Sequence, residues 1–215
     1  MTTETLKNPS IAIPSELVGI DKAIEHIRGR LAGIVWLDKA FGRAWTKPRV
    51  LGGKTVQEPL LYQGTGEYYP ALPNDALRSY SFFRVNSPRT TTNFAPNLNT
   101  GGAYRFTDSV DLIVWVDLKA INATADFIFT ELLIADVMNK LNNLRGPQAA
   151  VVNIYDDKVE DIFKGYDLRE IGQNLLLYPY KGFRIEMKLT YEFECVPAVA
   201  GAILAESEGG DQYLL

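Results

Sequence analysis

Carboxylates are the side chains of this sequence with the most evident capacity for chemistry. Asp156, Asp157, Glu160 and Asp161 fall within six residues, and helical carboxylates spaced i and i+4 can share a hard cation such as Ca²⁺ or Mg²⁺. The EF-hand spacing with its central glycine is absent, so the cluster favours a solvated acidic helix face. A metal-assisted hydrolase would need carboxylates from separate segments to converge in one pocket. The candidates for such a pocket are Asp108, Asp111, Asp156, Asp157 and Glu160.

Other reactive groups are few. The 215 residues include one His and one Cys, which excludes sites with several imidazole or thiolate ligands and excludes a disulfide within the chain. His26 is expected near solvent, and Cys195 is expected to be a small buried apolar group. Gly53-Lys54-Thr55 is similar to the end of a phosphate-binding loop, but Pro48 occupies the position of the first glycine, so we predict a turn. The sequence thus indicates no cofactor and no metal.

A basic and aromatic segment spans residues 36–49. Its rings are Trp36, Phe41 and Trp45, and its cations are Lys39, Arg43, Lys47 and Arg49. Aromatic rings interleaved with cations are typical of grooves that bind single-stranded nucleic acid. The same composition suits an amphipathic strand pair whose indoles pack while its cations reach solvent. The net charge of −4 favours this structural interpretation.

Charge is distributed unevenly along the chain. Residues 28–54 carry seven basic and one acidic side chain, whereas residues 155–215 carry six basic and twelve acidic ones. Segments of opposite charge can attract each other within one chain or between neighbouring subunits. The alternative is that both segments are solvated faces.

Two amphipathic helices are predicted to position these groups. The first covers residues 15–31, with Ser15 as its N-cap. Its apolar stripe consists of Leu17, Ile20, Ile24, Ile27 and Leu31. The second helix begins at Asn122 or Thr124 and runs to about Leu144, just before the stop signal Gly146-Pro147. A short acidic helix is expected over residues 156–164.

The strongest strand signal lies at residues 183–195, where apolar and polar residues alternate without a break. This pattern predicts one dry and one wet face, and therefore a sheet with one solvated side. Residues 79–85, 108–118 and 149–155 are further predicted strands. Residues 175–178 are expected to form a hairpin with the last strand.

The chain is predicted to consist of an N-terminal arm (residues 1–14), one domain (residues 15–195) and a C-terminal tail (residues 196–215). Residues 86–103 are rich in Asn, Thr, Pro and Gly, and we expect a long protruding loop there. The loop and termini are either disordered or ordered against a neighbouring subunit. The residues expected to contact other molecules are Arg43, Lys47, Arg49, Arg89, Asn93, Phe94, Asn97, Asp156, Asp157 and Tyr213.

These elements predict an α+β fold, a mainly antiparallel β-sheet packed by two amphipathic helices, with a long protruding loop and extended termini. From about residue 104 to 195 the pattern resembles small α+β proteins at the head-to-tail junction of tailed bacteriophages: connector, neck-ring and tail-terminator (tail-completion) proteins. The segments that carry the resemblance are DSVDLIVWVDL, DFIFTELLIADVMNKLNNL and YKGFRIEMKLTYEFEC. They cover about half of the chain, which is longer than is usual for that family.

The resemblance implies a non-enzymatic virion protein that is assembled in the host cytoplasm. It implies a homo-oligomeric ring of six or twelve copies, stacked on portal, connector or tail-tube proteins, with DNA passing through the lumen without sequence-specific binding and with no membrane contact. The alternatives are a nucleic-acid-binding module that uses residues 36–49 and the carboxylate and metal-dependent hydrolase.

Overall fold

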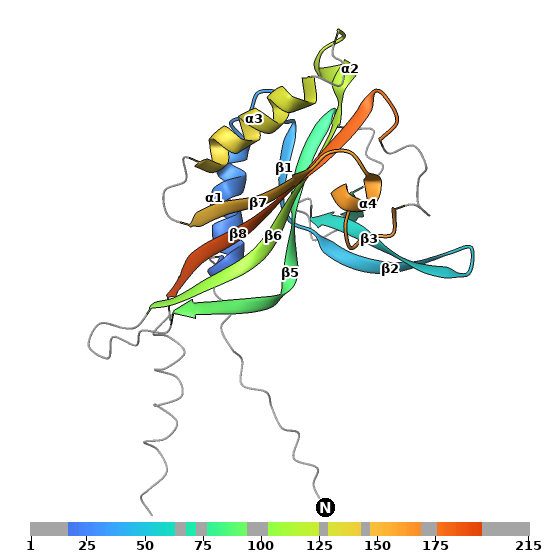
Figure 1. Cartoon of the computed structure of the whole chain (residues 1–215). Coiled ribbons are helices and arrows are strands. Elements are labelled where there is room, and N and C mark those ends of the chain that lie inside the picture. Colours follow the sequence, from blue (N-terminus) through green and yellow to red (C-terminus); the bar gives the residue numbers. More distant parts are fainter. Residues whose placement is uncertain are drawn as a thin grey trace, which may run out of the picture.

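The computed structural model describes residues 17–62, 68–71, 77–93, 103–124, 129–142, 147–168 and 176–194 (Figure 1). In chain order the elements are α1 (Gly19–Leu31), β1 (Lys39–Arg43), β2 (Trp45–Leu51), β3 (Lys54–Tyr62), β4 (Tyr68–Pro70), β5 (Ser79–Asn93), β6 (Ala103–Asp117), α2 (Leu118–Ile121), α3 (Phe129–Asn142), β7 (Gln148–Tyr155), α4 (Val159–Ile162) and β8 (Tyr180–Glu194). Within these residues no helix is both long enough and apolar enough to cross a membrane.

The main sheet has five strands in the order β1-β5-β6-β8-β7. Its three central strands are each 15 residues long, and every neighbouring pair is antiparallel except β1 and β5. The prediction of an α+β fold with mainly antiparallel strands is therefore confirmed.

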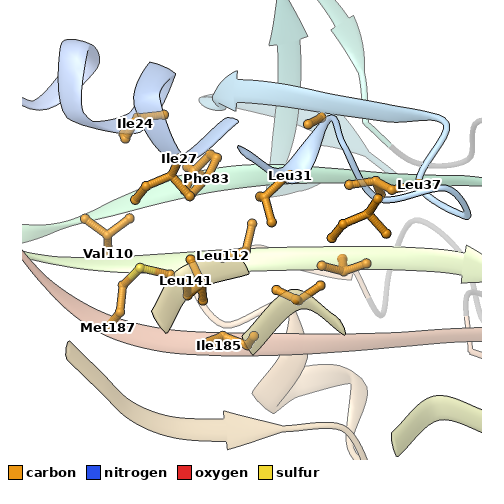
Figure 2. Close-up of a cluster of buried hydrophobic side chains, with 14 of the residues drawn as sticks. Ile24, Ile27, Leu31, Leu37, Phe83, Val110, Leu112, Leu141, Ile185 and Met187 are labelled. Carbon is orange, nitrogen blue, oxygen red and sulfur yellow. The ribbon is translucent and has the colours of Figure 1, made fainter. Parts of the chain in front are cut away.

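Helices α1 and α3 cover one face of the main sheet (Figures 1 and 2). The buried residues of α1 recur at helical spacing, and the buried residues of β6 and β8 alternate. The register pairs Val110 with Met187 and Leu112 with Ile185, so these side chains lie on the same face as the helices. This packing forms the larger of the two cores.

The opposite face is covered over only part of its length, so the expectation of a solvated side is only partly correct: Lys188 and Glu192 of β8 remain exposed there. Strands β2, β3 and β4 form a second sheet in that order, called the small sheet below, and this sheet and α4 contribute to a second core. Leu61 of β3 and Ile162 of α4 are buried with Trp115 of the main sheet. Arg184, on the predicted wet face of β8, is only 1% exposed. Alternation correctly separates the two faces, but it cannot show that other segments cover the polar one.

The first helix starts later than predicted. Helix α1 is preceded by Val18 as its N-cap, and Leu17 is 52% exposed, so the buried stripe begins at Ile20. The predicted cap, Ser15, lies outside the described residues.

Residues 122–124, where the second helix is predicted to begin, are not helical in the structure. Asp117 caps α2 by accepting a hydrogen bond from the backbone N–H of Ala120, and the described part of α3 spans Phe129–Asn142. Asn122, predicted as an N-cap, is instead the C-cap of α2, and Thr124 donates its backbone N–H to the Asn122 side chain. The local bonds of Asp117 and Asn122 therefore define a separate turn of helix.

Much of the predicted loop at residues 86–103 is strand. Strand β5 continues to Asn93 and pairs with β6 at Thr90↔Thr107 and Asn93↔Arg105, with register shifts on the way. The hydrogen bonds between β5 and β6 are made by backbone groups, so a segment with polar side chains can also form them. Thr, which is frequent in this segment, favours extended structure. Residues 94–102 lie outside the described part of the chain.

The prediction that residues 175–178 form a hairpin with the last strand is also wrong. Residues 176–179 form turns, and β8 pairs with β6 and β7 instead. The backbone N–H of Tyr180 donates to the carbonyl of Leu177 at 2.8 Å, so the chain turns directly before β8 begins.

Candidate interaction surface

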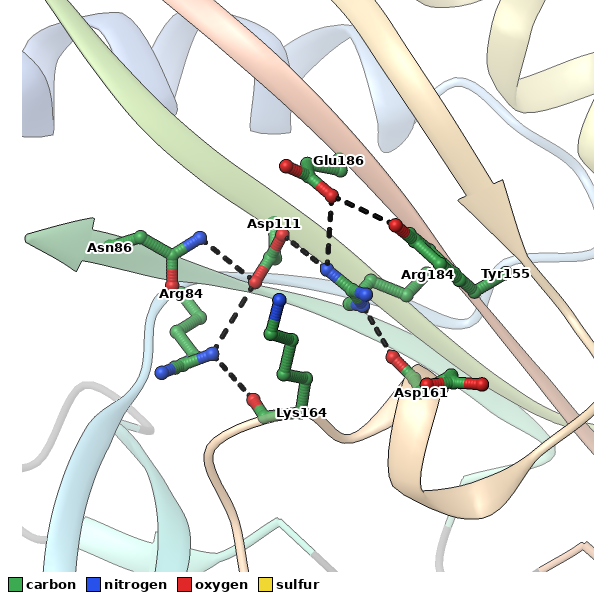
Figure 3. Close-up of polar contacts among 8 residues, drawn as sticks. All are labelled: Arg84, Asn86, Asp111, Tyr155, Asp161, Lys164, Arg184 and Glu186. Carbon is green, nitrogen blue, oxygen red and sulfur yellow. Dashed lines mark hydrogen bonds and ion pairs between the residues drawn. The ribbon is translucent and has the colours of Figure 1, made fainter.

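Asp111 and Arg184 form the centre of a buried polar cluster on the face of the main sheet that carries α4 (Figure 3). Their side chains are 0% and 2% exposed, and Oδ1 of Asp111 is 2.8 Å from Nη1 of Arg184. Oδ2 of Asp111 accepts a hydrogen bond from Asn86 at 3.0 Å and lies 3.5 Å from Nη1 of Arg84. Both oxygens of this carboxylate are therefore engaged.

The two arginines of this cluster also bind the segment around α4. Nε of Arg184 donates to the carbonyl of Asp161 at 2.5 Å, and Nη1 of Arg84 donates to the carbonyl of Lys164 at 2.5 Å. The Arg184 guanidinium lies 4.0 Å from the ring centroid of Tyr155.

Glu186 completes the charge balance of the cluster. Its carboxylate is 3.7 Å from Nη1 of Arg184 and accepts a hydrogen bond from the Tyr155 hydroxyl at 3.3 Å. Two guanidinium groups thus face two carboxylates. Paired and hydrogen-bonded charges of this kind hold the α4 segment in a fixed position on the sheet.

The carboxylates proposed for a hydrolase do not converge. Asp108 is three residues before Asp111 on β6, so it lies on the other face, where it accepts a hydrogen bond from the Tyr191 hydroxyl at 2.7 Å. Asp156 and Asp157 follow β7. Among the described residues, no three His, Cys, Asp or Glu side chains are grouped to hold a metal ion.

The small sheet gathers aromatic and basic side chains on one face. Strand β2 pairs with β3 in a register that places Trp45 opposite Leu60 and Lys47 opposite Glu58, and Tyr62 of β3 pairs with Tyr68 of β4. Because alternate residues of a strand share a face, Trp45 and Lys47 lie on the same side as the two tyrosines.

The rings on this face contact one another and remain exposed. The ring centroids of Trp45 and Tyr68 are 6.3 Å apart in an edge-on arrangement, and those of Tyr62 and Tyr68 are 5.3 Å apart. Trp45, Tyr62 and Tyr68 are 57%, 49% and 44% exposed. Clustered exposed aromatic side chains are typical of surfaces that bind another molecule.

Cations border the rings. The Arg43 guanidinium lies 6.0 Å from the centroid of the Trp45 ring, and Arg43 also lies 3.3 Å from Asp21. Arg49, half exposed, lies 3.5 Å from the buried carboxylate of Glu58. We call the following six residues the aromatic–basic surface: Arg43, Trp45, Lys47, Arg49, Tyr62 and Tyr68.

The β2–β3 hairpin projects from the molecule (Figure 1), and Trp45 and Tyr62 lie at the end of this strand pair that is opposite the turn. Gly52 and Gly53 have φ angles of 56° and 81°, the left-handed conformation that a tight hairpin turn requires and that glycine adopts easily. Of the turn predicted at Gly53-Lys54-Thr55, only Gly53 lies in the turn, whereas Lys54 and Thr55 begin β3. Pro48 is accommodated because β2 lies at the edge of its sheet.

A second exposed apolar surface lies on the main sheet. Strand β7 is at the sheet edge opposite β1, and Val152 and Ile154 are 48% and 40% exposed. A register shift between Val151 and Asn153 interrupts its pairing with β8. We call β7 and its exposed side chains the β7 edge.

The predicted contact residues are only partly brought together. Arg43, Lys47 and Arg49 lie in or beside the small sheet, whereas Asp156 and Asp157 follow the β7 edge. Arg89 and Asn93 belong to β5, but their side chains are not described, and Phe94, Asn97 and Tyr213 lie outside the described residues. The contact residues predicted from the sequence do not include Tyr62 and Tyr68. The available signal is that these two tyrosines flank the glycine-containing residues 63–67, a spacing typical of a hairpin that would bring them together.

Comparison of the sequence with protein-family models gives no match, and comparison with curated proteins gives none either. Because neither comparison gives a match, a function is inferred from the aromatic–basic surface and the β7 edge.

Proposed function

We propose that this protein is a non-enzymatic virion component, a subunit of a homo-oligomeric ring at the head-to-tail junction or tail terminus of a tailed bacteriophage. The observation that supports the proposal best is the aromatic–basic surface, whose three rings are about half exposed in the single chain. A contact with another molecule would remove these rings from water.

A ring needs two different surfaces on each subunit, because a head-to-tail contact joins unlike patches. The chain offers two such patches. The small sheet follows β1, at one edge of the main sheet, and the β7 edge lies at the other. The helices cover one face of the main sheet, and the small sheet and α4 cover part of the other, so its edges offer accessible routes to a neighbour.

The buried ionisable groups support a structural role. The Asp111 carboxylate binds both Arg184 and Arg84, and the two arginines donate to backbone carbonyls of the α4 segment. Groups arranged in this way fix a conformation, whereas an acid–base catalyst must face a substrate.

The proposed partners follow from the same assignment. The ring would contain six or twelve copies and would stack on portal, connector or tail-tube proteins. DNA would pass through its lumen without sequence-specific contacts, and the net charge of −4 would limit adhesion of the phosphates.

The native mass of the full-length chain tests the proposal. We expect a closed oligomer by native mass spectrometry and a ring by electron microscopy. Ile154→Asp at the β7 edge should reduce assembly, whereas Val35→Asp serves as control because Val35 is 98% exposed and lies outside both surfaces. A strictly monomeric protein at high concentration, alone and with purified portal or tail-tube rings, would contradict the proposal.

A second candidate function is binding of single-stranded nucleic acid by the aromatic–basic surface. Arg43 beside the Trp45 ring, with Lys47 and Arg49 on the same strand pair, is the observation that favours it. It predicts an electrophoretic shift of a single-stranded oligonucleotide at low salt that weakens as salt is raised. A complete lack of shift at low salt would rule this function out.

A further inference from the structure

The aromatic–basic surface has the chemistry of a receptor for an acidic segment with apolar side chains. Residues 39–62 carry five basic side chains and one acidic one, Glu58. Glu58 is 6% exposed and offers little charge at the surface. A ligand with several carboxylates would meet the cations, and its apolar side chains would pack on the rings.

The C-terminal residues 196–215 have the complementary composition. They contain Glu206, Glu208 and Asp211, they contain no Lys or Arg, and they end in Tyr213-Leu214-Leu215. Residues 1–16, by comparison, carry one Lys and two Glu. Charge complementarity therefore selects the C-terminal tail over the N-terminal arm.

The course of β8 favours the surface of a neighbouring copy over that of the same chain. The small sheet packs near Trp115, which pairs with Gly182 of β8, whereas β8 ends at Glu194, on the side away from the β2–β3 hairpin (Figure 1). Twelve residues of strand span about 40 Å. Because β8 runs away from the small sheet, residues 196–215 would have to reverse direction to reach the small sheet of their own chain, although twenty extended residues reach roughly 66 Å.

We propose that residues 196–215 of one copy bind the aromatic–basic surface of the next copy. Glu206, Glu208 and Asp211 would face Lys47 and Arg49, and Tyr213 would join the ring cluster of Trp45, Tyr62 and Tyr68. This inference rests on the proposed ring and names the contact that closes it.

Disulfide trapping in a mixture of two full-length chains tests the contact. Both chains carry Cys195→Ser; one carries Lys47→Cys, and the other carries Asp211→Cys and a mass tag. We expect a heterodimer of defined mass under oxidising conditions. Val35→Cys in place of Lys47→Cys is the matched control, because Val35 is highly exposed elsewhere on the surface, and it should give no heterodimer.

Charge reversal tests the electrostatic part of the proposal. Lys47→Glu with Arg49→Glu should weaken assembly of the full-length chain about tenfold. This is the change in affinity expected when a few exposed ion pairs are lost. Adding Glu206→Lys, Glu208→Lys and Asp211→Lys to the same chain should restore assembly. A failure of this restoration would contradict the assigned pairing.

The outcomes separate this inference from the proposed function. A ring that forms normally without the heterodimer overturns the tail contact and leaves the ring proposal standing, whereas a monomer overturns the ring. A crosslink found only within a chain carrying both cysteines overturns the contact between copies. An oligonucleotide shift abolished by Lys47→Glu with Arg49→Glu, with no heterodimer, assigns the surface to nucleic acid and overturns the tail contact.

Discussion

At the scale of single residues, burial decides what a charge does in this protein. Asp111–Arg184 and Arg105–Glu192 both join β6 to β8 at 2.8 Å, but the first pair is buried and the second is more than half exposed. An exposed pair is surrounded by water that already solvates each charge, so it contributes little. A buried pair leaves an uncompensated charge when one partner is removed.

Asp111→Ala should therefore lower the free energy of unfolding by about 3–5 kcal/mol, because Arg184 would lose its buried carboxylate. Glu192→Ala, the matched exposed control, should cost about 1 kcal/mol or less. Urea denaturation at neutral pH measures both changes. Similar losses in the two variants would show that burial does not govern these pairs.

We expect the free energy of unfolding to fall at alkaline pH because Tyr166 is buried. Burial raises the pKa of Tyr166 to about 12, whereas tyrosine in an unfolded chain titrates near pH ~10. The folded state thus keeps a proton that the unfolded state releases, so this contribution is complete below about pH 10 and is lost as the pH rises towards 12.

Tyr166→Phe should flatten the decline of unfolding free energy over that pH range. Part of the slope should remain, because burial also raises the pKa of Tyr80. Tyr178→Phe is the control, since Tyr178 is 45% exposed. Equal slopes in the wild-type and Tyr166→Phe proteins, measured by urea titration at several pH values, would contradict the assignment.

At the scale of elements, amphipathic patterns place α1 and the central strands around one core. Ile27 of α1 is fully buried in the core against the main sheet, whereas Leu132 of α3 is 62% exposed. Ile27→Ala should destabilise the protein by about 2–5 kcal/mol because it leaves a cavity in packed surroundings. Leu132→Ala should cost less than about 1 kcal/mol. Chemical denaturation would show whether the two truncations differ in this order.

At the scale of the whole molecule, the small sheet and the β7 edge are surfaces that a neighbour could cover. If only the folded chain associates, the melting temperature should rise with protein concentration. For a chain of this size we expect a rise on the order of 2–5 °C per tenfold increase. Calorimetry over a hundredfold concentration range measures it, and the rise should shrink in Ile154→Asp. A melting temperature independent of concentration would argue against assembly.

The fold class and the main apolar surfaces can be predicted from the amino-acid sequence. The stripe from Ile20 to Leu31 and the alternation from Phe183 to Tyr191 both form buried faces in the structure. These patterns are readable because each element repeats with its own backbone period, whatever surrounds it. The signal of a turn glycine is equally local, so the turn at Gly53 can be predicted from the sequence.

The segments that pack on the second face of the sheet, and the residues that form the aromatic–basic surface, become visible only in the folded molecule. Arg184 is buried because α4 and its neighbours cover it, and Tyr62 and Tyr68 meet Trp45 because β3 pairs with both β2 and β4. The physical reason is that burial and contact depend on which distant segments pack together, and a periodic pattern records only which way each side chain points.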